Sequence, residues 1–178
     1  MPVSEVNAKI GLPGGMAEIG GTWVPGDQER VAAWEMYVEL VTRVSVVELK
    51  PTDGLVREAL SSLHSLFDTT RTILRSHGPD VAVAQSGSVV SFGHLAVTVL
   101  NQIVRPFLAE WHPRLCEYEA RRPDGTSQQA WEQAWDKNAE VRGALNDVRT
   151  SLISYTGILG EICGAKGMLT LSVIGGND

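Results

Sequence analysis

The feature that most constrains the fold is a long apolar stripe in the middle of the chain. Its members follow one another at steps of three or four residues, which places side chains on one face of an α-helix. They are Phe92, Ala96, Val99, Ile103, Phe107, Trp111, Leu115 and Tyr118. Pro106 and Pro113 lie inside the pattern, and each removes one backbone donor. The apolar phase is unchanged across both prolines, so the sequence predicts one helix over residues 88–120 that is kinked and not broken.

A second helix is predicted before this one, over residues 28–47. Asp27 is a good N-cap, and it follows the turn Pro25-Gly26. The spacing of Val31, Trp34 and Val38 predicts that these side chains form the inner face of the helix.

Two more amphipathic segments complete the helical part of the chain. Thr52 or Asp53 is expected to cap a helix that runs to about Ser76, where Gly78-Pro79 ends it. Thr126 and Gln129 are predicted to form a capping box at the start of a helix that continues to about Cys163.

Four long helices joined by short loops favour antiparallel neighbours. We therefore predict an all-α fold, an antiparallel up-down-up-down four-helix bundle with a kinked third helix, over residues 25–164. Residues 1–24 are rich in glycine and are predicted to be a flexible arm, with a short extended piece at Gly21–Val24. Residues 165–178 are predicted to be a C-terminal tail, flexible or partly extended. Its side chains alternate like those of a strand, so it could be disordered, pair with the N-terminal arm or add to a partner's sheet.

The composition narrows the class of protein. A chain of 178 residues is expected to form one domain, and a net charge of −6 argues against general binding of nucleic acid. Cys116 and Cys163 are far apart in sequence and are expected to be free thiols in a reducing compartment. No apolar run approaches the roughly 20 residues that span a bilayer, and no signal peptide is recognisable. We expect a cytoplasmic protein that does not bind a membrane.

A polar seam follows the central stripe and is the first candidate site. It consists of His94, Thr98, Asn101, Arg105 and His112. The seam could form a ligand pocket or active site that uses Asn101, Arg105 and His112. It could instead be a buried polar network that fixes the helix register, or a helix face that meets water. A partly buried charge needs a counter-charge, so Arg105 is predicted to be at least half buried and paired with Glu35, Glu39 or Asp68.

Two Arg–His pairs give a catalytic alternative. Arg71 with His77, and Arg105 with His112, have the spacing typical of HEPN ribonucleases, which are helical bundles. A histidine could shuttle the proton in an attack by a ribose 2′-hydroxyl, and an arginine could stabilise the phosphate. The family usually places a polar residue such as asparagine after the arginine, whereas Thr72 and Pro106 stand there in this chain.

Motifs for metals and cofactors are missing. The Glu-x-x-His pattern of di-iron bundles does not occur, and neither do zinc, Walker or nucleophile-elbow motifs. We therefore predict no metal and no cofactor. The five tryptophans are expected to lie mainly in the core, and any exposed one would mark an interface.

Three stretches carry a resemblance to a known group of proteins. They are AWEMYVELVTRV, REALSSLHSLFDTTRTILRSHGP and LNQIVRPFLAEWHPRLCEYEARRP. They resemble small uncharacterised helical proteins of actinobacteria that are associated with conflict and defence loci. The resemblance implies a cytosolic accessory protein and brings no catalytic residue with it.

The leading functional prediction is a non-enzymatic helical-bundle module that binds another protein, such as an effector of a bacterial defence system, or a second copy of itself. The first alternative is a HEPN-like ribonuclease that uses Arg105 and His112. The second is a small-ligand sensor that uses the seam of His94, Asn101, Arg105 and His112.

Overall fold

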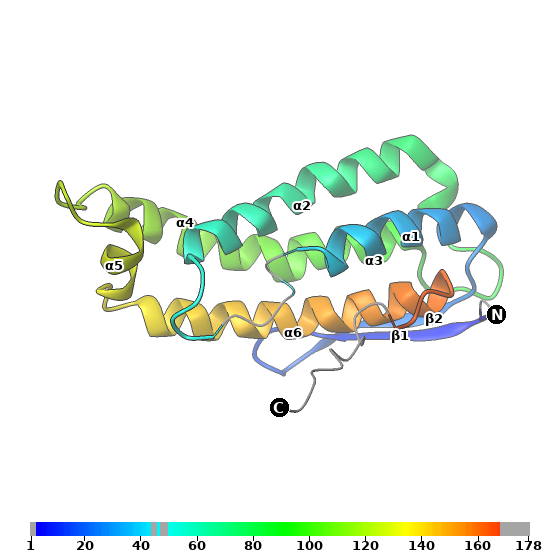
Figure 1. Cartoon of the computed structure of the whole chain (residues 1–178). Coiled ribbons are helices and arrows are strands. Elements are labelled where there is room, and N and C mark those ends of the chain that lie inside the picture. Colours follow the sequence, from blue (N-terminus) through cyan, green and yellow to red (C-terminus); the bar gives the residue numbers. More distant parts are fainter. Residues whose placement is uncertain (1–2, 44–45, 47–49, 168–178) are drawn as a thin grey trace, which may run out of the picture.

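The computed structural model describes residues 3–43, 46 and 50–167. The protein is mainly helical and carries one small antiparallel sheet (Figure 1). In chain order the elements are β1 (Val6–Gly11), β2 (Glu18–Trp23), α1 (Asp27–Val41), α2 (Val56–His77), the 3₁₀ turn η1 (Pro79–Val81), α3 (Phe92–Val99), the π turn η2 (Leu100–Val104), α4 (Arg105–Glu119), α5 (Gln128–Gln133) and α6 (Asn138–Ile162). The helical class is confirmed, but the chain is not all-α. None of the helices in the described ranges is long and apolar enough to cross a membrane.

The N-terminal segment is a β-hairpin, and the prediction of a flexible arm for it is wrong. β1 and β2 pair from Val6–Trp23 to Gly11–Glu18, and the hairpin lies along α6 (Figure 1). Val6, Ala8 and Ile10 alternate into the core, as a half-buried strand requires. Ser151 of α6 donates a hydrogen bond to the Gly11 carbonyl at 2.6 Å and fixes the end of β1. The predicted C-terminal tail lies outside the described residues from 168 onward.

Helix α1 buries a different face from the predicted one. Val31 and Trp34 are 48% and 43% exposed. The buried side chains belong to Ala32, Ala33, Met36, Tyr37 and Leu40. Apolar residues occur on both faces of α1, so its periodicity could not indicate which face packs inward. The predicted end of this helix at residue 47 lies outside the described residues.

The central helix passes through both prolines without a break, as predicted. It runs from Phe92 to Glu119 as α3, η2 and α4. Pro106 cannot donate to the carbonyl of Gln102, and the chain widens into a π turn immediately before it. The Arg105 amide donates five residues back, to the carbonyl of Leu100. Pro113 lies inside α4, which continues past it.

The last predicted helix is two helices. The chain leaves the α-helical path after α5 and resumes it at Asn138. Trp135 lies in this break and is buried, with its ring 5.2 Å from that of Tyr118 and 6.2 Å from that of Trp111. Trp131 of α5 also stacks on Tyr118, so both tryptophans face α4.

A buried carboxylate joins three segments near the N-terminal end of α1. Glu29 is 1% exposed. It accepts hydrogen bonds from the Trp23 indole at 3.1 Å, the Gly26 amide at 2.9 Å and the Phe92 amide at 2.8 Å. Phe92 is the first residue of α3, so a side chain of α1 satisfies free amides of two helix N-termini.

A second buried carboxylate caps α2, and the predicted caps Thr52 and Asp53 are wrong. The residue before α2 is Leu55, which has no side chain acceptor. Glu132 of α5 accepts instead from the Val56 amide at 2.7 Å and the Arg57 amide at 3.4 Å. Arg142 of α6 donates to the same carboxylate at 3.4 Å. The start of α2 is therefore held by Glu132, which lies 76 positions after Val56 in the chain.

Candidate functional site

The predicted polar seam is divided among separate surroundings. His94 lies 3.3 Å from the Ser91 hydroxyl, at the start of α3. Asn101 lies in the π turn and accepts a hydrogen bond from Arg105, the first residue of α4. His112 is exposed on α4 and lines a pocket to which neither Asn101 nor Arg105 contributes. The seam is thus no single ligand site.

Arg105 has no carboxylate partner among the described residues, and the predicted ion pair is wrong. Its side chain is exposed, its Nε donates to Asn101 Oδ1 at 3.1 Å, and its guanidinium lies 4.9 Å above the ring of Phe67. The three proposed partners contact other basic side chains: Glu35 contacts His77, Glu39 contacts Arg43, and Asp68 contacts Arg71. Arg105 directly follows the π turn, and its guanidinium lies over Phe67 of α2 at the surface.

Replacing Arg105 by alanine is therefore expected to cost less than about 1 kcal/mol, the range of exposed polar and cation–π contacts. Arg43 is the matched control, because its side chain is only 11% exposed and donates to Ser62, Ser65, Thr69 and Glu39. Arg43→Ala should cost about 2 kcal/mol or more, since it removes the four hydrogen bonds of a largely buried guanidinium. Urea unfolding of both variants compares the two, and a larger loss for Arg105→Ala would contradict this description.

A small pocket of about 200 Å³ lies between α2 and α4 around His112. His64, Ser61 and Arg57 of α2 face it from the other side. Arg57 is held by Glu119, to which its Nε donates at 3.0 Å. In the other predicted pair, Asp68 holds Arg71 and Glu35 holds His77, so each arginine and histidine has a different partner. Neither predicted Arg–His pair therefore shares a pocket or a partner among the described residues.

A larger groove of about 500 Å³ lies between α1 and α2. The two helices run antiparallel there, because His77 contacts Glu35 while Arg43 contacts Ser62 and Thr69. The apolar part of the groove comes from Trp34, Val38 and Ile73. Its polar part comes from Glu35, Glu39, Asp68, Thr69 and Thr72.

The acidic and basic side chains of this groove lie at different depths. The Glu35 side chain is 43% exposed, whereas that of its partner His77 is 9% exposed. Glu39 is likewise 48% exposed above the largely buried Arg43. The hydrogen bond from Arg71 holds the pKa of Asp68 below its usual value, so this carboxylate is ionised at neutral pH. The groove therefore presents carboxylates to solvent and keeps the side chains of His77 and Arg43 beneath them.

Sequence reasoning missed three features that organise these surfaces. The caps by Glu29 and Glu132 join residues far apart in the chain, so no local motif marks them. The exposure of Trp34 was hidden by the two apolar faces of α1. The sequence nevertheless contains an indication of this exposure, since an alternative inner face at helical spacing is formed by Ala32, Ala33, Met36 and Leu40.

The part of the chain that the structure describes contains no group of three or more His, Cys, Asp or Glu side chains placed to hold a metal ion. Comparison of the chain with family models, curated proteins and solved structures gives no match.

Proposed function

We propose that the protein is a non-enzymatic interaction module that binds another protein through the groove between α1 and α2. The observation that carries this proposal is the exposure of Trp34, beside Val31, on a helix whose other apolar face is buried in the core. Large aromatic side chains at a surface dominate the energy of protein interfaces. A groove of about 500 Å³ beside Trp34 provides room for the partner's side chains.

The chemistry of the groove favours a basic amphipathic helix as the bound segment. Two antiparallel helices form its walls, and a third helix packs well in such a groove. Apolar side chains of the partner would contact Trp34, Val38 and Ile73. Lysine or arginine side chains at its edges would meet the exposed carboxylates of Glu35, Glu39 and Asp68.

The sequence resemblance supplies the setting of this proposal. A module of this kind would act as an accessory or regulatory component of a bacterial defence system, with the helix contributed by an effector protein. We interpret α1, α2, the central helix and α6 as an up-down-up-down bundle in which the α1–α2 groove is an open side. The expected compartment is the cytoplasm.

A synthetic peptide tests the proposed groove directly. The probe is a helical peptide with leucine at positions i, i+3, i+4 and i+7 and lysine elsewhere, and a glutamate version serves as its charge control. Isothermal titration should show binding of the lysine peptide only. Trp34→Ala should weaken this binding about tenfold or more. Ile153→Ala removes another exposed apolar side chain, on α6, and should leave binding unchanged.

Equal affinities of the wild type and Trp34→Ala would contradict the proposed docking site. Equal binding of the lysine and glutamate peptides would contradict the assigned partner chemistry. Circular dichroism of each variant confirms that its helices are retained.

A further inference from the structure

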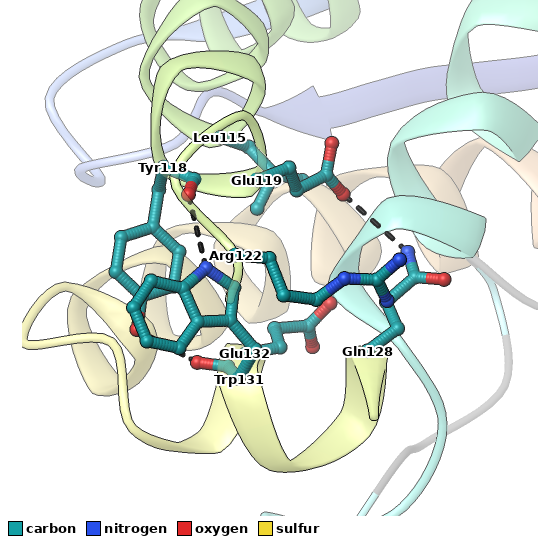
Figure 2. Close-up of a pocket in the computed structure, with 7 residues that line it drawn as sticks. All are labelled: Leu115, Tyr118, Glu119, Arg122, Gln128, Trp131 and Glu132. Atoms are coloured by element: carbon teal, nitrogen blue, oxygen red, sulfur yellow. Dashed lines mark hydrogen bonds between the residues drawn. The ribbon is translucent and has the colours of Figure 1, made fainter. Parts of the chain in front are cut away.

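A second cavity, unrelated to the α1–α2 groove, lies where the last turn of α4 meets α5. It encloses about 200 Å³. Figure 2 shows its side chains converging from the two helices and the turn between them. The ones that matter below are Tyr118, Glu119, Arg122, Gln128, Trp131 and Glu132.

One wall of this cavity is a rigid aromatic stack. The rings of Tyr118 and Trp131 are 4.6 Å apart and only 7° from parallel. Two reciprocal hydrogen bonds lock them: the Tyr118 hydroxyl donates to the Trp131 carbonyl at 2.8 Å, and the Trp131 indole donates to the Tyr118 carbonyl at 2.9 Å. The ring of Trp135 stacks on Tyr118 at 5.2 Å. A flat ligand would therefore meet a surface that needs no rearrangement to receive it.

Both carboxylates of the cavity already have donors. Glu119 accepts from Arg57 at 3.0 Å and from the Gln128 amide at 3.5 Å (Figure 2). Glu132 accepts hydrogen bonds from the Val56 amide, at the start of α2, and from the Arg142 guanidinium. Neither carboxylate is free to hold a cation or a ligand's donor groups.

The remaining charged side chain of the cavity is that of Arg122. Its side chain is exposed, and Figure 2 shows it extending from the Trp131 side of the cavity toward Gln128. Within the described ranges no side chain forms an ion pair or hydrogen bond with its guanidinium. A guanidinium offers five donors in a planar fork, which matches a carboxylate or phosphate oxygen pair.

We propose that this cavity binds a small planar carboxylate, whose anionic group pairs with Arg122 and whose ring lies against Trp131. The volume suits a single ring rather than a nucleotide. The nearby carboxylates of Glu119 and Glu132 favour a monoanion, because they would repel the second charge of a phosphate. The Gln128 amide nitrogen donates one hydrogen to Glu119 and has a second one for a further oxygen of the ligand.

Benzoate is the probe, followed through the side-chain NH signals in ¹H–¹⁵N spectra of the whole chain. Trp131→Phe identifies the Trp131 indole signal by its loss. Benzoate should shift the signals of Trp131 and Gln128 with a dissociation constant on the order of 1 mM. Arg122→Gln should weaken binding about tenfold. Arg121→Gln is the matched control, because Arg121 precedes Arg122 and lies over Tyr118 without lining the cavity, and it should bind as the wild type does.

Benzamide and inorganic phosphate complete the experiment. If benzamide binds as well as benzoate, the charge recognition is wrong. If phosphate displaces benzoate at equal concentration, the preference for a planar monoanion is wrong. No shift with benzoate up to about 10 mM, or unchanged binding in Arg122→Gln, overturns the proposal. Unchanged signals elsewhere in the spectrum show that each variant is folded.

Discussion

Glu29→Ala is expected to lower the free energy of unfolding by about 4 kcal/mol, the largest effect of any single substitution considered. Three donors would lose their acceptor: the Trp23 indole and the amides of Gly26 and Phe92. The Trp23 side chain is fully buried, and the Phe92 amide is buried at the start of α3, so water cannot replace the carboxylate without local opening. An unsatisfied buried donor costs about 1–3 kcal/mol.

Glu29→Gln separates the loss of charge from the loss of an acceptor. The amide keeps one oxygen, but its NH₂ group would face a donor, so we expect an intermediate loss of about 2 kcal/mol. Glu117→Ala, at an exposed position on α4, should stay within about half a kcal/mol. Urea unfolding of the four proteins gives the comparison. Coinciding midpoints for Glu29→Ala and Glu117→Ala would show that Glu29 does not hold the three segments together.

Glu132→Ala is expected to cost about 3 kcal/mol, because it removes the cap of α2 and leaves Arg142 without its carboxylate. Arg142 would keep the carbonyls of Lys50, Asp53 and Gly54, at 3.4, 3.0 and 3.1 Å. Loss of the cap should free the Val56 amide, so its hydrogen exchange should accelerate more than that of amides in the middle of α2.

A second substitution tests the charge component of this effect. Arg142→Met in the Glu132→Ala background removes the unpaired cation and should recover part of the stability. Glu140→Ala is the control, since Glu140 forms an exposed pair with Lys137 on the same helix. If the double variant is less stable than Glu132→Ala alone, the carbonyl contacts of Arg142 outweigh its missing counter-charge.

The sequence predicted the helices well where one face alone is apolar. The stripe from Phe92 to Tyr118 specifies its helix almost completely, including passage through two prolines. It did not specify the inner face of α1, because Val31 and Trp34 compete with Ala33 and Met36 for the core. The hairpin was not predicted because the glycines indicated a flexible segment, although Val6, Ala8 and Ile10 alternate as in a strand. Thr52 and Asp53 looked like caps because nothing local indicates that a distant Glu132 takes their place.

The candidate site was less accessible to sequence reasoning than the fold. Position on a helix suggested that Arg105 lies beside the core, but its exposure depends on how closely α2 approaches α4. The groove beside Trp34 is made by two helices, and its charge depends on which partner of each ion pair lies deeper. Those quantities follow from tertiary packing, which periodicity in one segment does not encode.

The π turn before Pro106 explains an arithmetic feature of the central stripe. Steps of four outnumber steps of three, so side chains on an ideal helix would drift by about 80° between Phe92 and Tyr118. A π turn takes up one additional residue, equivalent to about 100° of rotation, and so returns the stripe to one face. Leu100–Val104 thus behaves as a one-residue insertion in an otherwise regular helix. Deletion of one residue within Leu100–Val104 would therefore leave the relative orientation of α3 and α4 unchanged.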